Sequence, residues 1–119
     1  MLPKITVASS AGGISPPDAF VPDPSGAVSR TVFETNEYPT LKIYIREFSF
    51  RPDRQARTIT LPSAAVIQIS GEHTDVRIAK ERVALVWDAQ KAVPAHTQIE
   101  VENGGTRPVV MRALIVEPK

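Results

Sequence analysis

Short alternating segments separated by turn residues fill the sequence from Thr40 onward, and this pattern constrains the fold most strongly. Proline or glycine stands between many of these segments, and none shows a sustained period of 3.6 residues with helix caps. A period of two is typical of β-strands that bury one face. The strand candidates are Thr40–Phe50, Thr58–Leu61, Val66–Ile69, Val76–Ile78, Val83–Trp87, Thr97–Glu102 and Val109–Val116. About eight short strands at intervals of about ten residues predict an all-β antiparallel barrel or jelly roll.

The phase of the alternation changes within Thr40–Phe50. Its apolar residues are odd-numbered up to Ile45 but even-numbered at Phe48 and Phe50. A β-bulge near Glu47 would turn both sets toward the core. We therefore expect apolar side chains to fill the interior of the barrel. The expected set is Ile43, Ile45, Ile59, Val66, Ile69, Leu85, Ile99, Val101 and Leu114.

The first 30 residues have a different composition from the rest. Five of the eleven prolines and three of the six glycines lie between Met1 and Arg30. Proline interrupts the hydrogen bonding of both helices and sheets, so only Lys4–Val7 suggests a short edge strand there. We expect residues 1–30 to form a proline-rich arm or linker and residues 31–119 to form a single barrel domain.

Charge and composition disfavour several classes of function. The chain has 14 basic and 13 acidic side chains, a net charge of +1, and no cysteine. It therefore lacks a long-range field that would attract nucleic acid or anionic lipid, and it has no thiolate metal site. No segment approaches the roughly 18 apolar residues of a membrane span, and the N-terminus does not resemble a secretory signal. We expect a cytoplasmic protein that binds neither nucleic acid nor membranes.

The order of strands and turns from Thr40 to Lys119 resembles that of a cupin. Gly71 stands where the first cupin motif ends, and Pro94 and Asn103 match the proline and asparagine of the second motif. More narrowly, four segments are similar in order to the C-terminal cupin domain of type I phosphomannose (mannose-6-phosphate) isomerases: REFSF at 46–50, PSAAVIQISGEHT at 62–74, VPAHTQIEVE at 93–102 and MRALIVE at 111–117. In that family the zinc site and the sugar-phosphate chemistry lie in a separate domain. The resemblance therefore implies a non-catalytic, structural role.

The positions that hold the metal in cupin enzymes carry other residues in this chain. Cupin spacing counted back from the glycine of the first motif reaches Thr58, Thr60 and Ala64, and Ile99 takes the place of the histidine in the second motif. None of these residues is a usual metal ligand. We therefore expect neither a metal nor another cofactor.

His73 and Asp75 are the candidate catalytic residues. They are two residues apart, so on a strand they would share a face, and an acid could then orient a histidine base. Such a dyad would suit a cofactor-free sugar isomerase or epimerase. The sequence GEHTD around them is also typical of a solvated loop.

Arginine, tryptophan and histidine residues supply the candidates for ligand binding. Guanidinium groups suit phosphate, and Arg46, Arg51, Arg54 and Arg57 lie close together in the sequence, although interspersed acidic residues are also typical of a solvated surface. Trp87 would stack on a sugar at a barrel mouth or pack in the core. His96 follows a proline-alanine turn and would lie at the rim. The candidate ligand-binding residues are Arg46, Arg57, Trp87 and His96.

Three functions remain open from the sequence. The first is a metal-free cupin-like domain with a structural or interaction role, not an enzyme by itself, that forms a homodimer or binds a partner chain. The second is a module whose barrel mouth binds a small anionic sugar such as a sugar phosphate. The third is the cofactor-free isomerase. Fold alone does not choose among them.

Overall fold

The computed structural model describes residues 19–71, 73–83 and 90–119, and these residues form strands, turns and loops. The strands are β1 (Val21–Pro22), β2 (Val28–Thr35), β3 (Leu41–Phe50), β4 (Arg57–Thr60), β5 (Ala65–Ser70), β6 (Thr74–Ile78), β7 (Glu81–Val83), β8 (Gln90–Val93), β9 (Gln98–Asn103) and β10 (Val109–Pro118). The six-stranded sheet has the order β1-β2-β3-β10-β5-β8, and the four-stranded sheet has the order β4-β9-β6-β7. Within the described ranges, no helix is long and apolar enough to cross a membrane.

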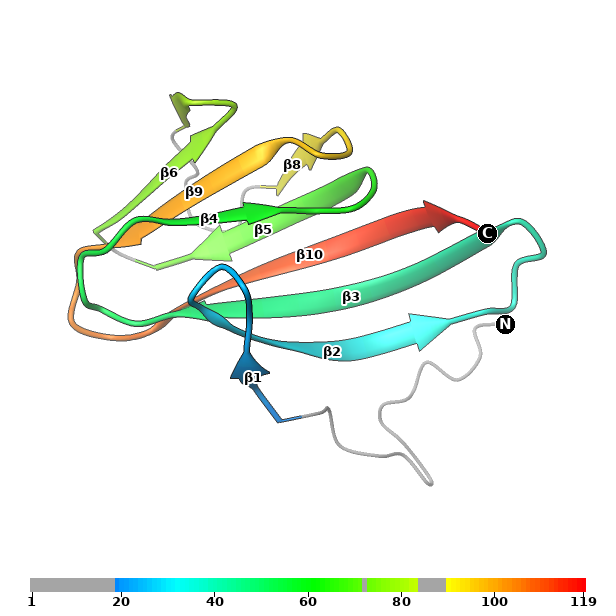
Figure 1. The fold of residues 1–119 in the computed structure, drawn as a ribbon, viewed down its shortest axis with the longest axis horizontal. Helices are drawn as coiled ribbons and strands as arrows, with labels where there is room; N and C mark the ends of the chain where they lie inside the picture. The colour runs from blue at the N-terminus through cyan, green and yellow to red at the C-terminus, as the bar shows by residue number, and fades with distance from the viewer. Residues whose placement is uncertain (1–18, 72, 84–89) are drawn as a thin grey trace.

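The two sheets form the two layers of a jelly roll, as Figure 1 shows. Every strand pair is antiparallel. Strands β2, β3 and β10 are longer than the strands of the second layer, and they extend beyond β4 toward the C-terminus (Figure 1). One end of the larger sheet therefore has an inner face that the smaller sheet does not cover. The predicted all-β antiparallel fold is confirmed.

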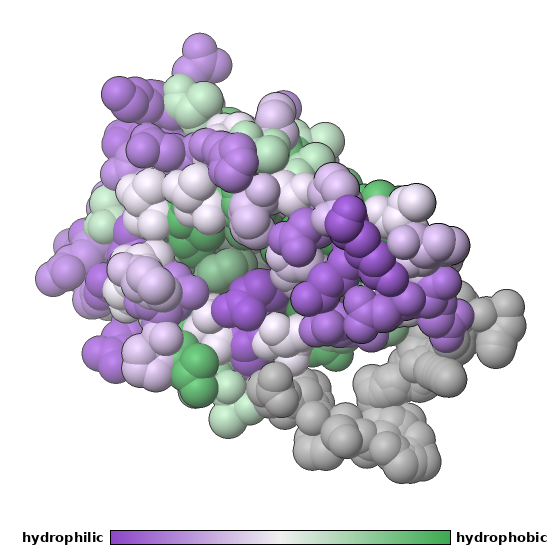
Figure 2. Space-filling view, turned by 45° about the vertical axis from the view of Figure 1, so that its right-hand side comes forward, coloured by the Kyte–Doolittle hydropathy of each residue, from purple (hydrophilic) through white to green (hydrophobic). Residues whose placement is uncertain are grey.

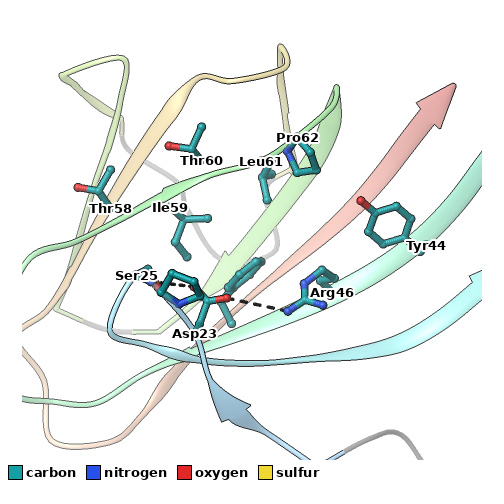
Figure 3. A pocket seen from close by; sticks show the side chains of 11 residues that line it. Asp23, Ser25, Tyr44, Arg46, Thr58, Ile59, Thr60, Leu61 and Pro62 are labelled. Atoms are coloured by element: carbon teal, nitrogen blue, oxygen red, sulfur yellow. Dashed lines mark hydrogen bonds and ion pairs between the residues drawn. The ribbon is translucent and has the colours of Figure 1, made fainter.

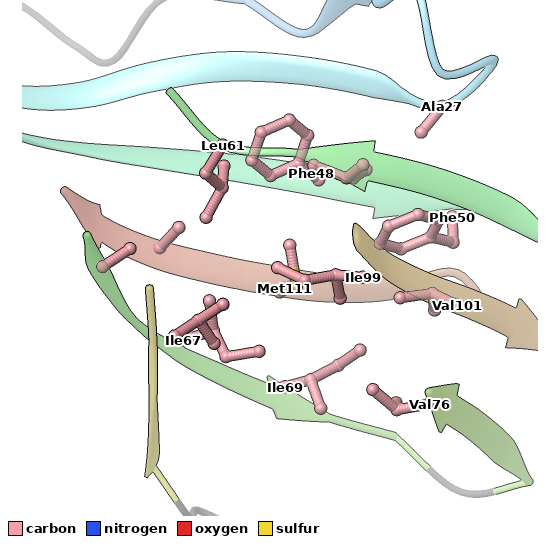
Figure 4. Packing of buried hydrophobic residues seen from close by; sticks show 14 of the residues in the cluster. Ala27, Phe48, Phe50, Leu61, Ile67, Ile69, Val76, Ile99, Val101 and Met111 are labelled. Carbon is pink, nitrogen blue, oxygen red and sulfur yellow. The ribbon is translucent and has the colours of Figure 1, made fainter. Parts of the chain in front are cut away.

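The hydrophobic core lies between the two layers (Figure 4). Phe48 and Phe50 on β3 pack with residues of β5, β9 and β10. The fully or almost fully buried side chains include Phe50, Ile67, Ile99, Val101, Met111 and Ile115. The expected core positions Ile59, Ile69, Ile99 and Val101 are all buried.

The predicted bulge near Glu47 is wrong. β3 pairs with β10 in unbroken register along its whole length, and the bulge of this sheet lies in β2, between Thr31 and Phe33. Strict alternation therefore turns the even-numbered residues of β3 inward and the odd-numbered ones outward. The four expected core residues that lie on the outer face instead are Ile43, Ile45, Val66 and Leu114. Leu85 lies outside the described residues.

Three strands, β1, β2 and β8, lie where the sequence pattern predicted none. β2 follows a turn at Asp23–Gly26, and β8 pairs with β5. The sheet therefore includes residues of the proline-rich arm from Val21 onward, and Ala27 and Ser29 of that arm are buried. The predicted edge strand Lys4–Val7 lies outside the described residues.

Glu47 is a buried carboxylate on the outer face of the six-stranded sheet, where only 6% of it is exposed. Arg30 on β2 contacts one carboxylate oxygen at 2.8 Å, and Arg112 on β10 contacts the other at 2.7 Å. Burial raises the pKa of Glu47, but hydrogen bonds from the two arginines and their charges outweigh burial, so its pKa lies below the ordinary value. The ionised form is therefore favoured by folding.

The stability of the fold should decrease in acid, in part because of Glu47. Since its native pKa is lowered, its contribution is fully present above the ordinary value of 4.5 and is lost as the pH falls through the lower native value. We expect the urea midpoint of unfolding to fall between about pH 7 and about pH 3, and we expect Glu47→Gln to reduce that fall. An unchanged pH dependence in the variant would show that Glu47 is not responsible.

Candidate functional site

A cavity of about 460 Å³ opens between the inner face of β3, strand β4 and the turn that follows β1. We call it the mouth cavity. Its lining residues are Asp23, Pro24, Ser25, Tyr44, Arg46, Phe48, Thr58, Ile59, Thr60, Leu61 and Pro62. Figure 2 brings the right-hand end of Figure 1 forward, and it shows hydrophobic surface exposed between hydrophilic side chains. The cavity combines apolar walls with a few polar groups, which is typical of small-molecule sites.

The turn after β1 places an aspartate at the edge of the mouth cavity. The amide of Gly26 donates a hydrogen bond to the carbonyl of Asp23 (2.9 Å), and Gly26 has a φ of 93°, which favours glycine. The Asp23 carboxylate accepts hydrogen bonds from the amide of Ser25 (3.0 Å) and the hydroxyl of Ser29 (3.1 Å). Burial raises the pKa of Asp23, but these hydrogen bonds and the nearby Arg46 outweigh it and lower the pKa. Asp23 is thus held as a carboxylate.

Arg46 reaches the mouth cavity from the inner face of β3, as Figure 3 shows. Its guanidinium donates hydrogen bonds to the hydroxyls of Thr31 (3.1 Å) and Ser29, and one of its nitrogens lies 4.0 Å from Asp23. The guanidinium carbon lies 5.6 Å from the centre of the Phe48 ring. The side chain is 30% exposed. The two hydrogen bonds fix the position of the Arg46 side chain. They leave other N–H donors of the guanidinium without a protein partner among these contacts, so Arg46 can still bind an anion.

Tyr44 lies two residues before Arg46 on the same face of β3. Its hydroxyl donates a hydrogen bond to the carboxylate of Glu117 on β10 (3.0 Å). Burial and the Glu117 carboxylate raise the pKa of Tyr44 to about 12, so the phenol stays protonated near neutral pH. Lys42 lies over the Tyr44 ring at 5.3 Å and 3.5 Å from a carboxylate oxygen of Glu34. Paired charges therefore lie along the inner face of β3 beyond the cavity.

The structure separates the four predicted ligand-binding residues. Arg46 lines the mouth cavity. Arg57 begins β4, lies over Gly26 and contacts the Asp53 carboxylate at 2.6 Å, so it supports the turn at the cavity edge. His96 is exposed in the turn before β9, where its amide donates a hydrogen bond to the carbonyl of Leu61. Trp87 lies outside the described residues.

The two candidate catalytic residues lie away from the mouth cavity. His73 is exposed in the turn between β5 and β6, with a φ of 60°, and its carbonyl accepts a hydrogen bond from the amide of Gly104. Asp75 on β6 contacts Arg82 at 3.1 Å and Arg77 at 3.9 Å. Neither residue lines the mouth cavity. The geometry therefore gives no reason to place isomerase chemistry in this cavity.

The residues at the positions of cupin metal ligands take different places in the fold. Thr58 and Thr60 are exposed on β4, and Figure 3 shows their side chains directed away from Arg46. Ala64 is exposed beside the outer face of the six-stranded sheet, and Ile99 is buried in the core. In the described part of the chain, no group of three or more histidine, aspartate or glutamate side chains could hold a metal ion.

Most of the residues that support Arg46 were not among those predicted from the sequence. Asp23, Ser25 and Ser29 belong to the segment expected to be an arm, and Thr31 directly follows it. A signal for them was present, because Asp-Pro-Ser-Gly at 23–26 is a typical turn sequence. The segment VSRTVFET that follows is also rich in β-branched residues.

Comparison with solved structures identifies the fold class. The plu4264 protein from Photorhabdus luminescens is similar with a TM-score of 0.64 at 11% identity, over 92% of this chain and 85% of that chain. A cupin-2 domain protein from Rhodospirillum rubrum is similar with a TM-score of 0.57 at 11% identity, over 95% of this chain and 72% of that chain. A cupin superfamily protein from Desulfitobacterium hafniense has a TM-score of 0.50 at 18% identity, over 75% of this chain and 77% of that chain. The chain therefore has a cupin-like fold.

Comparisons of the sequence itself give no closer assignment. No protein-family model matches the chain. No curated protein matches it either. Structural similarity at such low identity shows the fold alone, so function must be argued from the site.

Proposed function

We propose that this protein is a cupin-like binding module that holds a small anionic, hydroxyl-bearing molecule, such as a sugar phosphate, in the mouth cavity. The observation that carries the proposal is the position of Arg46, whose half-buried guanidinium is held by Ser29 and Thr31 at the cavity wall. A guanidinium presents several N–H donors in a fixed plane, which suits phosphate and carboxylate oxygens. No bound metal is required for this role.

The rest of the cavity suits the carbon skeleton of such a ligand. Phe48, Ile59 and Leu61 supply apolar wall, against which the C–H groups of a sugar ring would pack. A volume of about 460 Å³ lies within the usual range of small-molecule pockets. A sugar phosphate suits this arrangement, because it joins one anionic group to a hydroxyl-bearing ring.

The charge balance of the cavity favours a ligand with a single anionic group. Asp23 lies 4.0 Å from Arg46 and partly offsets its charge. The Asp23 carboxylate accepts hydrogen bonds from the amide of Ser25 and the hydroxyl of Ser29. It thereby orients Ser29 toward Arg46. A polyanion would meet repulsion from Asp23 and from Glu117 on the same inner face.

Replacing Arg46 with glutamine should weaken binding of mannose 6-phosphate by about ten- to a hundredfold, because a hydrogen bond to a charged group contributes about 1.5–3 kcal/mol. Isothermal titration calorimetry of the full chain measures this change, with mannose as the uncharged comparison ligand. Arg51→Gln is the matched control, since Arg51 is exposed and does not line the cavity. Equal affinity of wild type and Arg46→Gln, or an equal loss in the control, would contradict the proposal.

The structural or interaction role is a second candidate, and a separate feature favours it. The core between the layers is closely filled by side chains, while the outer face of the six-stranded sheet carries apolar residues. An outer face of a sheet in contact with water is usually polar. We therefore propose that face, and not the mouth cavity, as the surface for an interaction role.

A further inference from the structure

The outer face of the six-stranded sheet carries a block of apolar side chains that we call the outer block. Cross-strand register places Phe33, Ile45 and Leu114 side by side, and Val66 and Ala92 continue the same row. A second row of apolar residues, which includes Ile43 and Val116, lies beside the first on the same face. The outer block consists of Phe33, Ile43, Ile45, Ala64, Val66, Ala92, Pro94, Leu114 and Val116. Val66 is 38% exposed and Leu114 is 37% exposed, although both are large apolar residues of strands that have a neighbouring strand on each side.

The charges beside the outer block are already paired. The neighbouring row contains Glu47 between Arg30 and Arg112, and Arg30 also lies 4.2 Å from the centre of the Phe20 ring. The outer block itself contains no charged residue. Covering this face would therefore bury no carboxylate that lacks a partner, and the row beside the outer block would keep one net positive charge from its two arginines and one glutamate. An apolar partner surface complements it better than a charged one.

The two halves of the outer block differ in side-chain size. β10 runs between them. On the side of β2 and β3 stand the large residues Phe33, Ile43 and Ile45, whereas on the side of β5 and β8 the small residues Ala64 and Ala92 border a hollow of about 440 Å³. A two-fold axis parallel to β10 would place the large half of one copy over the hollow half of another. The surface is therefore complementary to itself, as an isologous interface requires.

We propose that a second copy of this chain covers the outer block, so that the protein is a homodimer whose six-stranded sheets pack face to face. The five strands β2, β3, β10, β5 and β8 have an outer face on the order of 600 Å² per copy, from the usual strand rise and spacing. Two such faces reach the lower bound of about 1,200 Å² for a specific interface. The proposal concerns a different surface from the mouth cavity, so either can fail without the other.

Sedimentation velocity of the full chain across a range of concentrations tests the dimer. Wild type should sediment as a dimer at micromolar concentration, and Leu114→Lys should raise the dissociation constant at least about tenfold, because it buries a charge at the centre of the interface. Gln98→Lys is the control, since Gln98 is an exposed strand residue of the other sheet. A wild type that stays monomeric, or a Leu114→Lys variant that stays dimeric, would overturn the proposal.

A cross-linking experiment keeps the proposal testable if Leu114→Lys does not fold. The sequence has no cysteine, so a single introduced thiol is unique. Packed sheets lie about 10 Å apart, and a bismaleimide with a span of about 8 Å should join two copies of Leu114→Cys. Gln98→Cys should remain uncross-linked under the same conditions. Equal yields of linked dimer for the two variants would contradict the assignment of this face.

Discussion

Replacing Phe50 with alanine is expected to lower the free energy of unfolding by about 3–5 kcal/mol. Phe50 ends β3 on its inner face, lies opposite Val109 of β10, and is 1% exposed. It therefore contributes to the packing between the two layers (Figure 4). Truncation removes the buried ring and leaves a cavity that a close-packed core fills only in part.

Urea denaturation followed by far-UV circular dichroism measures the effect of Phe50→Ala. The matched control is Tyr38→Ala, because Tyr38 is an aromatic residue of the loop before β3 and is 47% exposed. We expect the control to change the free energy of unfolding by no more than about 1 kcal/mol. Similar losses for the two variants would mean that Phe50 does not occupy the central core.

Replacing Asn103 with alanine should cost about 2–4 kcal/mol, because it leaves buried polar groups without partners. The Asn103 side chain is 1% exposed and ends β9. Its amide nitrogen donates hydrogen bonds to the carbonyls of Phe50 (3.0 Å) and Arg107 (2.7 Å), and its oxygen accepts one from the amide of Gly105 (2.9 Å). One side chain thus joins the turn before β10 to the end of β3.

The Asn103 prediction is checked by the same denaturation measurement, with Asn36→Ala as control. Asn36 is exposed in the loop between β2 and β3, so its truncation should change stability by about 0.5 kcal/mol or less. Backbone amide exchange adds a local readout, since the β9–β10 turn should lose protection in Asn103→Ala first. A loss no larger than the control's would show that the turn does not depend on this side chain.

Much of the strand pattern could be predicted from the sequence because turn residues separate the strands. Pro62 and Ser63 lie between β4 and β5, and Asn103 with the glycines after it ends β9. The predicted segments Thr58–Leu61 and Val109–Val116 match β4 and β10 to within two residues at each end. Local turn chemistry acts over a few residues, so it can be read without knowing which strands pair.

The choice of face in β3 could not be predicted, because both faces of this strand are apolar in part. Ile45 and Phe48 belong to opposite faces, and alternation alone does not say which face is inside. The burial of Glu47 on the outer face made this harder, since its two arginine partners come from β2 and β10. Partners distant in the sequence are fixed by sheet register, which a single sequence does not give.

The candidate site was predicted only in part for a similar reason. Arg46 could be predicted from its type and from neighbouring arginines, whereas no motif marks Tyr44 and Ser29 lies in the expected arm. The contacts that make Arg46 a binding group join β3 to β2 and to the turn after β1. They depend on how the arm joins the sheet, and composition predicts that poorly because proline-rich segments are found in both linkers and ordered turns.

The proposed function depends on the Arg46 guanidinium, which should bind the anionic group of a small ligand in the mouth cavity. The most direct measurement is a two-dimensional ¹⁵N–¹H spectrum of the arginine Nε–Hε groups during titration with mannose 6-phosphate, assigned with Arg46→Lys. We expect a saturable shift of the Arg46 signal, with the signals of Arg51 and Arg112 unchanged, since both lie outside the cavity. A stationary Arg46 signal at saturating ligand, or a shift shared equally by all arginines, would contradict it.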